Sequence, residues 1–157
     1  MRGNTLYMAT NNLDRVYKSE DYGDNWEVFY NGLPRIFGYP SGIAGSMLTS
    51  GDKVFLGGTN FGLRYSDLAD TAWTETNKDK GAYVYALSLI GKDSIMVCQG
   101  GFNGGLSFFS SDNGETWTQL GAEPLPNLTI SATAYAYIQN RLVAITDAGG
   151  DNSTFYS

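Results

Sequence analysis

The sequence predicts an all-β fold made of repeated four-stranded units, and three observations support this prediction. The chain matches itself with a period of 44 to 47 residues over its 157 residues. Each complete period holds four short apolar segments of strand-forming residues, separated by turn residues. The composition, with 14% aromatic residues and 20 glycines, is typical of strands joined by tight turns. Four short antiparallel strands in every period of this length are the signature of a β-propeller blade.

An eight-residue motif anchors the repeat. Residues 19–26 (SEDYGDNW) and 110–117 (SSDNGETW) both match the pattern S-x-D-x-G-x-x-W. A degenerate copy at 66–73 keeps the serine and the tryptophan but has Leu68 and Asp70 where the other copies have Asp and Gly. The serines lie at positions 19, 66, 110 and 157, in steps of 47, 44 and 47 residues. All three tryptophans of the chain occupy the last position of the motif, so the period does not depend on the serines alone.

The motif predicts a turn between the third and fourth strands of each unit. An Asp side chain can accept backbone N–H bonds within such a turn, and a Ser hydroxyl can assist it. Gly supplies a positive φ without steric cost, and the Trp can bury a large face between neighbouring sheets. We therefore assign a structural role in these turns to ten residues: Ser19, Asp21, Gly23, Trp26, Ser66, Trp73, Ser110, Asp112, Gly114 and Trp117.

The predicted strands follow in order along the chain. The first unit supplies three strands, at 6–10, near 16–19 and after Trp26. The second has strands at 43–48, 53–57, 62–66 and 72–75, and the third at 83–90, 94–98, 106–110 and 116–120. The fourth supplies strands at 129–138, 142–146 and 153–157. The single domain thus divides into units at about 5–31, 42–77, 82–121 and 128–157, which is about three and a half blades.

The two ends of the chain offer overlapping sets of strands. The first unit lacks its first strand and the last unit lacks its fourth strand, so the ends cannot complete one shared blade. Open blade faces and strand edges promote aggregation. We therefore expect a segment of a larger propeller, or self-association if the chain is a complete protein.

Charge and composition exclude several classes of function. The net charge is −6, and the 10 Lys and Arg residues do not cluster, which argues against nucleic acid or an anionic membrane as the partner. No apolar run is long enough to span a membrane, and the N-terminus shows no signal peptide. The chain has no histidine, which removes Ser-His-Asp and Cys-His catalysis and histidine-bound metals. Cys98 is the single cysteine, and we predict no metal and no cofactor.

The motif at this spacing resembles the Asp-box, also called the bacterial neuraminidase repeat. Families with this repeat include sialidases, xyloglucan-cleaving glycosidases, sortilin-type receptors and a photosystem assembly factor. The resemblance implies a β-propeller and an extracellular or cell-envelope location, but it specifies fold far more strongly than function. In sialidases the boxes lie at the periphery, away from the catalytic centre. The resemblance therefore implies that Asp21 and Asp112 are structural and not catalytic.

Candidate binding residues lie in the loops that join second to third strands and one unit to the next. In propellers, ligands generally meet the face that these loops form. Aromatic rings beside amides and acids suit sugar recognition, although plain turn formation and packing between blades remain the alternative. The candidates are Arg35, Phe37, Tyr39, Asn60, Phe61, Phe102, Asn103 and Asp147.

Three functions remain open. The main prediction is a non-catalytic propeller module that binds a glycan or a protein partner. The first alternative is a fragment of a glycoside hydrolase of the sialidase or xyloglucanase type. A sialidase-like site needs three convergent arginines, but the chain has five in all, and Leu33-Pro34-Arg35-Ile36 departs from the family's Arg-Ile-Pro motif. The second alternative is an assembly or scaffold factor that acts through protein contacts.

Overall fold

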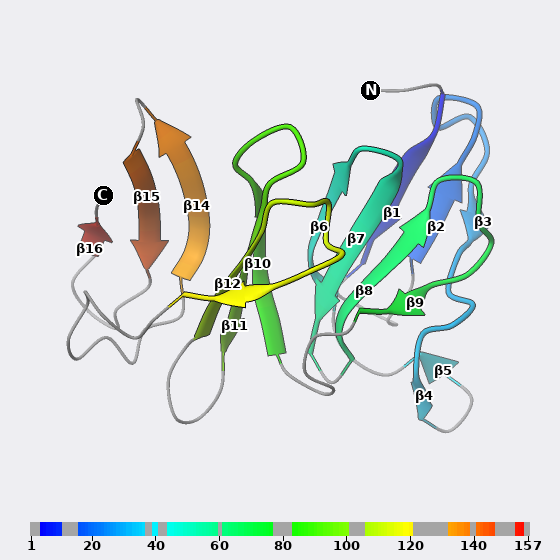
Figure 1. Cartoon of the computed structure of the whole chain (residues 1–157). Coiled ribbons are helices and arrows are strands. Elements are labelled where there is room, and N and C mark those ends of the chain that lie inside the picture. Colours follow the sequence, from blue (N-terminus) through cyan, green and yellow to red (C-terminus); the bar gives the residue numbers. More distant parts are fainter. Residues whose placement is uncertain are drawn as a thin grey trace.

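The computed structural model describes most of the chain and shows an all-β architecture (Figure 1). The described residues are 4–10, 16–36, 39–40, 44–59, 61–76, 83–100, 106–120, 132–138, 141–146 and 153–155. Within these ranges the regular secondary structure consists of strands and no helix. The predicted all-β fold class is confirmed.

Four antiparallel sheets follow one another along the chain. The first sheet holds β1 (Leu6–Ala9), β2 (Val16–Ser19) and β3 (Glu27–Val28). The second holds β6 (Ala44–Ser50), β7 (Lys53–Gly58), β8 (Gly62–Asp67) and β9 (Thr74–Glu75). The third holds β10 (Tyr83–Leu89), β11 (Ile95–Gly100), β12 (Leu106–Ser110) and β13 (Thr118–Gln119). The fourth holds β14 (Ala132–Ile138), β15 (Arg141–Thr146) and β16 (Ser153–Phe155).

A small hairpin between the first two sheets was not predicted. It joins β4 (Arg35–Ile36) to β5 (Tyr39–Pro40), with Ile36 paired to Tyr39. From the sequence we expect one long loop over this stretch. The hairpin lies at the lower edge of the molecule in Figure 1, beyond the ends of the main sheets.

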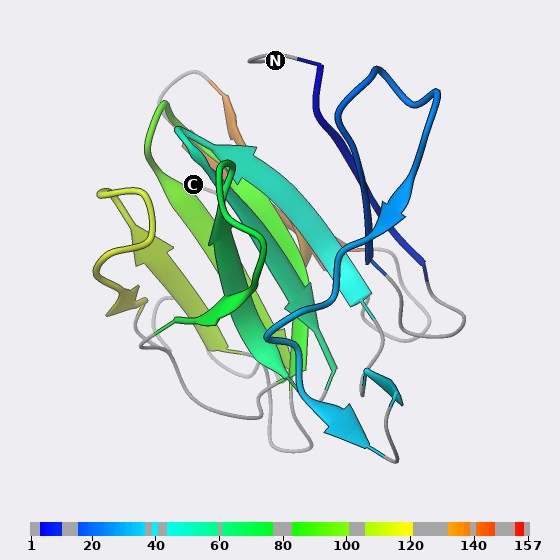
Figure 2. The same cartoon turned by 90° about the vertical axis from the view of Figure 1, so that its right-hand side faces the viewer.

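The four sheets stand side by side in sequence order, as blades do around a propeller (Figure 1). Strands β6, β10 and β14, the first strand of each of the last three sheets, are neighbours in space. Figure 2, seen from the side of the first sheet, shows the second and third sheets one behind the other. The described fold is therefore a set of consecutive propeller blades.

The hydrophobic core lies in the seams between sheets. In the first seam, Val16 and Phe29 of the first sheet region pack with Val54 and Leu56 of β7. In the second seam, Phe55 of β7 packs with residues of the third sheet. Side chains alternate between the two faces of a strand, so β7 supplies Val54 and Leu56 to one seam and Phe55 to the other. Each full burial of such a side chain contributes about 1.5–3 kcal/mol.

At some positions neighbouring sheets lie too close together to leave room for a larger side chain. A Cβ atom on Gly57 of β7 would lie 2.3 Å from Cγ1 of Val84 in β10. The glycine thus allows the backbone of the second sheet to approach the third.

Candidate functional site

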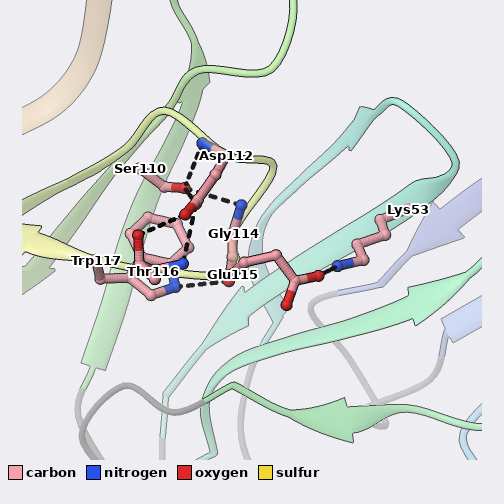
Figure 3. A network of polar contacts seen from close by, with 7 residues as sticks. All are labelled: Lys53, Ser110, Asp112, Gly114, Glu115, Thr116 and Trp117. Carbon is pink, nitrogen blue, oxygen red and sulfur yellow. Dashed lines mark hydrogen bonds and ion pairs between the residues drawn. The ribbon is translucent and has the colours of Figure 1, made fainter.

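The turn between β12 and β13 holds its own shape through a closed hydrogen-bond network (Figure 3). The hydroxyl of Ser110 donates to Oδ1 of Asp112 (2.7 Å) and accepts from the backbone N–H of Gly114 (2.8 Å). Asp112 also accepts from the backbone N–H of Thr116 (2.9 Å) and from its hydroxyl. The ring N–H of Trp117 donates to the carbonyl of Gly114 (3.1 Å). Each of these hydrogen bonds joins two residues of the eight-residue motif.

The turn between β2 and β3 repeats this network almost atom for atom. Ser19 donates to Asp21 (2.8 Å) and accepts from the N–H of Gly23 (2.8 Å). Asp21 accepts from the backbone N–H of Asn25 (2.9 Å) and from its side-chain amide (2.6 Å). Trp26 donates to the carbonyl of Gly23 (3.0 Å). The amide of Asn25 thus does what the hydroxyl of Thr116 does in the later turn.

Both networks need two consecutive residues with positive φ. These residues are Tyr22 (62°) and Gly23 (100°) in the first turn, and Asn113 (56°) and Gly114 (82°) in the later one. Gly adopts such angles freely and Asn tolerates them, whereas a bulky side chain is strained there. Tyr22 is therefore the strained residue of the pair of turns, and its side chain is largely exposed.

The networks also fix the charge of the two carboxylates. The backbone N–H of Asn25 is the main cause that lowers the pKa of Asp21 to about 2, and the hydroxyl of Thr116 is the main cause that lowers the pKa of Asp112 to about 2. A general acid or base works best with a pKa near the operating pH. Since both carboxylates are strong turn acceptors with very low pKa values, they are suited to structure and not to proton transfer.

The degenerate copy at 66–73 forms a different kind of turn. None of its residues has a positive φ, and its Ser66 hydroxyl donates only to the carbonyl of Asp67 (3.2 Å). Its Trp73 donates from the ring N–H to the carbonyl of Phe29 in the neighbouring sheet region (2.9 Å). The backbone N–H of Trp73 donates to the carbonyl of Asn31 (2.7 Å). This tryptophan therefore ties the second sheet to the first.

The three tryptophans differ in burial although they share one motif position. Trp73 is 3% exposed, whereas Trp26 is 40% exposed. We predicted that these tryptophans can bury a large face between neighbouring sheets. Trp73 does so, whereas much of the ring of Trp26 remains exposed.

A charged contact links the second sheet to the turn of the third (Figure 3). Lys53 at the start of β7 forms an ion pair with Glu115, and its ammonium group lies 4.8 Å from the ring centroid of Tyr65. Burial alone would lower the pKa of Lys53, but the bond to Glu115 and nearby negative charges outweigh it and raise the pKa. The ammonium group therefore stays charged inside the seam.

The predicted binding residues lie mostly outside the described part of the chain. Phe37, Asn60, Phe102, Asn103 and Asp147 are not among the described residues. For Arg35 and Tyr39 the structure describes the backbone but not the side chain. Arg35 lies in β4 and Tyr39 in β5, on facing strands of the small hairpin.

Phe61 is the one predicted binding residue whose side chain is described, and it is buried. Its ring is 4% exposed and packs in the seam between the first and second sheets. Its carbonyl accepts a hydrogen bond from Nε of Arg64 (3.3 Å). The ring is therefore a core side chain.

Gln99 near the end of β11 is a feature that the sequence analysis did not single out. It follows the apolar run Ile95–Cys98 and is 4% exposed. Its side-chain Nε2 has no hydrogen-bond partner among the residues that the structure describes. A buried, unpaired amide donor is costly in a folded protein, so such a group points to a missing partner. In the sequence, the signal that could have identified Gln99 is a polar residue directly after the apolar run Ile95–Cys98.

The described residues offer no cluster for metal chemistry. No group of three or more His, Cys, Asp or Glu side chains comes together among them. Over the same ranges, the chain forms no long apolar helix of the kind that crosses a membrane.

One curated protein resembles the sequence. The chain is 28% identical over 122 residues to the photosystem II assembly lipoprotein Ycf48 of Picosynechococcus sp., an alignment that covers 74% of this chain and 33% of that protein. The chain thus spans about a third of the length of this relative. No protein-family model matches the sequence.

Solved structures support the propeller fold. A structure of Ycf48 bound to a D1 peptide aligns with a TM-score of 0.65 and 15% identity over 99% of this chain and 49% of that one. An ancestral GH74 enzyme aligns with a TM-score of 0.67 and 16% identity over 91% of this chain and 20% of that one. At these identities the likeness concerns the fold alone. The chain is thus a run of β-propeller blades, similar to those of Ycf48 and of GH74 enzymes.

Proposed function

We propose that this chain is an assembly or scaffold propeller that acts by binding a protein partner. The observation that carries the proposal is its similarity to Ycf48, which is named as an assembly lipoprotein and whose structure was solved with a D1 peptide. Among the three functions open from the sequence, this observation favours protein contacts over glycan binding. Because the chain covers a third of that relative, the partner itself is part of the proposal.

The chemistry of the described residues supports a non-catalytic role. A glycosidase needs two carboxylates placed on either side of the scissile bond. The carboxylate oxygens of Asp21 and Asp112 instead accept hydrogen bonds within their turns, and the chain has no histidine to act as a base. Similarity to GH74 enzymes therefore reflects the shared blade architecture.

We further propose that the motifs at 19–26 and 110–117 are Asp-box turns. The support is the repetition of one Ser–Asp–Gly–Trp hydrogen-bond network in two turns 91 positions apart. In this proposal the two turns stabilise the outer part of their blades, and they take no part in partner binding.

The partner is proposed to bind at the end of the sheets that carries the β4–β5 hairpin (Figure 1). Strand β11 also ends toward this side (Figure 1), and Gln99 is its second-to-last residue. An amide donor suits a peptide carbonyl oxygen as its acceptor. Gln99 is 4% exposed, so a peptide would gain this hydrogen bond only if its binding opened the end of β11, and the bond would then remove the cost of the unpaired donor.

The test is fluorescence anisotropy with the D1 peptide found in the Ycf48 structure, carrying a dye. Saturable binding of this peptide, with none of a scrambled peptide of the same composition, is the expected result. The variant Gln99→Leu should bind about 10-fold more weakly, since one hydrogen bond is worth about 1 kcal/mol or somewhat more. Gln119→Leu, on the exposed strand β13, is the matched control and should bind normally.

The glycan and enzyme alternatives are measured on the same sample. Xyloglucan oligosaccharides are titrated in place of the peptide, and their hydrolysis is followed by release of reducing ends. Binding of the oligosaccharide without any binding of the peptide, or measurable turnover, would contradict the proposed function.

A further inference from the structure

The turn at residues 30–33 connects the first sheet to the β4–β5 hairpin. The backbone N–H of Leu33 donates to the carbonyl of Tyr30 (3.0 Å), and Gly32 has a φ of 82°. This hydrogen bond, with a positive φ at the third of four residues, is typical of a type II β-turn. Leu33 is 6% exposed and packs in the core between the first two sheets. The chain is therefore fixed two residues before the hairpin begins at Arg35.

The degenerate motif of the second sheet holds this turn. The backbone N–H of Trp73 donates to the carbonyl of Asn31 (2.7 Å), and the side-chain amide of Asn31 donates to the carbonyl of Thr71 (3.4 Å). The ring N–H of Trp73 donates to the carbonyl of Phe29 (2.9 Å), one residue before the turn. In Figure 1 this connection runs from β3 past β9 to β4. We call the contact of residues 29–33 with Thr71 and Trp73 the turn clamp.

The two backbones of the turn clamp also touch at Gly32. A Cβ atom on Gly32 would lie 2.0 Å from the carbonyl oxygen of Trp73 and 3.0 Å from its carbonyl carbon. These are backbone atoms at the start of a strand, so they cannot move aside as the end of a flexible side chain can. Any side chain at position 32 would therefore have to separate the turn from Trp73.

The loss of the motif glycine makes the turn clamp possible. An indole ring has a single N–H donor. In the third sheet this donor bonds inside the motif, from Trp117 to the carbonyl of Gly114, and the motif at 19–26 forms the same bond. In the degenerate copy Asp70 stands in place of that glycine, and the ring N–H of Trp73 bonds to the neighbouring sheet region. The degenerate motif has thus exchanged an internal hydrogen bond for one that holds the next connection.

The β4–β5 hairpin is a segment that needs such support. Its two strands are two residues long and pair with each other, Ile36 with Tyr39. An isolated two-stranded hairpin is at best marginally stable in water. A fixed point close to its base reduces the conformational entropy that is lost when the hairpin forms. The turn clamp provides this fixed point, because it ends at Leu33.

We propose that Trp73 and Gly32 are positioning residues, which orient the β4–β5 hairpin for the partner through the turn clamp. The part of the inference that concerns the partner rests on the proposed function, because the hairpin marks the end of the sheets where we place the partner. The order of the hairpin itself is a property of the free chain. In this inference the degenerate motif serves the neighbouring connection, whereas the intact motifs stabilise their own turns.

The test is hydrogen exchange of residues 35–40 in the ligand-free chain, followed by mass spectrometry. Local opening controls the exchange of such a segment, so a lower global stability alone does not change it. Gly32→Ala should speed this exchange at least about 10-fold, because it separates the turn from Trp73 and adds the cost of a positive φ. Gly114→Ala is the matched control, since Gly114 also has a φ of 82° and a Cβ there would lie 2.6 Å from Phe55. It should leave the exchange of the hairpin unchanged.

A milder pair of variants keeps the test valid if an alanine at position 32 prevents folding. Trp73→Phe removes the ring N–H but keeps an aromatic ring in the seam. It should speed the exchange of the hairpin about 5-fold, as expected for the loss of one hydrogen bond of the turn clamp. Trp26→Phe removes a hydrogen bond inside an intact motif and is the control, which should exchange at the parent rate over residues 35–40.

Binding of the labelled D1 peptide separates this inference from the proposed function. Gly32→Ala and Trp73→Phe should bind the peptide about 10-fold and about 5-fold more weakly, and their controls should bind it normally. A parent chain that does not bind the peptide would contradict the proposed function, while faster exchange in Gly32→Ala would still support the positioning of the hairpin. Equal exchange of residues 35–40 in Gly32→Ala and Gly114→Ala would overturn the inference. Exchange in the parent at the rate of an unfolded chain, or faster exchange in Gly32→Ala with unchanged peptide binding, would overturn it as well.

Discussion

Gly114 and Gly23 occupy the same motif position but differ in what surrounds them, and this difference yields a sharp prediction. Both have positive φ, at 82° and 100°, and both accept the ring N–H of their own tryptophan. A Cβ at Gly114 would lie 2.6 Å from Cε1 of the fully buried Phe55, across the seam. At Gly23 the nearest atom to a Cβ is 3.4 Å away, which is ordinary contact.

The expected free energies follow from two separate costs. An alanine with positive φ costs about 1–2 kcal/mol, and this cost applies to both Gly23→Ala and Gly114→Ala. Overpacking a filled core costs about 1–3 kcal/mol more, and it applies to Gly114→Ala alone because only its Cβ would overlap a fully buried ring, that of Phe55. Gly114→Ala should therefore lower the free energy of unfolding by about 2–5 kcal/mol, and Gly23→Ala by about 1–2 kcal/mol.

The two variants are compared by urea denaturation followed by tryptophan fluorescence. For a domain of this size, 1 kcal/mol corresponds to a shift in Tm of about 2–4 °C, which a thermal melt resolves. Equal losses in the two variants would refute the reasoning, because they would show that Phe55 does not restrict Gly114.

Three further predictions concern single groups. Trp73→Phe should lower the free energy of unfolding by about 1–3 kcal/mol, since it leaves the buried carbonyl of Phe29 unpaired. Trp26→Phe should lower it less, because water replaces the lost hydrogen bond at an exposed ring. Urea denaturation compares the two variants. Tyr22→Asn should stabilise the fold by about 0.5–1 kcal/mol, because Asn tolerates a φ of 62°, and a higher urea midpoint is the readout. The pKa of Asp21 and of Asp112 falls from 3.8 to about 2 in the folded chain, so both carboxylates stabilise the fold above pH 3.8, and this stability is lost as the pH falls toward 2. Thermal melts of Asp21→Asn and Asp112→Asn at pH 2 to 7 should show a smaller loss of Tm on acidification than the parent chain, and a parallel pH profile would count against the turn networks.

The sequence was sufficient to predict the fold because each blade repeats local signals. Strand β7 at 53–58 was expected at 53–57, and β12 at 106–110 was expected at the same residues, since apolar runs bounded by turn residues determine both. The β4–β5 hairpin was missed because its strands are two residues long and depend on pairing with each other. So short a segment carries no periodic pattern.

Side-chain environments were harder to predict because they depend on the neighbouring sheet. Trp26 and Trp73 occupy the same position of the sequence motif, yet Trp73 is buried in a seam and Trp26 is exposed. Phe61 was expected on a binding face and is buried in the seam between the first and second sheets. A sequence repeat specifies the blade, but burial requires knowledge of which sheet stands next to it.

The degenerate motif shows what a blade turn requires. It has lost the Asp and the Gly, and with them the closed network, yet the backbone N–H of Leu68 still donates to the carbonyl of Asp52 (2.8 Å) in the β6–β7 turn. The intact motifs make the corresponding bonds from Tyr22 to Asn4 and from Asn113 to Asp93, both within about 3 Å. The link between the two turns of a blade is therefore kept in all three copies, and the internal network is not. Trp73 donates to the carbonyl of Phe29 in the preceding sheet region (2.9 Å), whereas Trp26 bonds within its own motif. In the second sheet a contact with the preceding sheet region thus stands where the other two copies have an internal network.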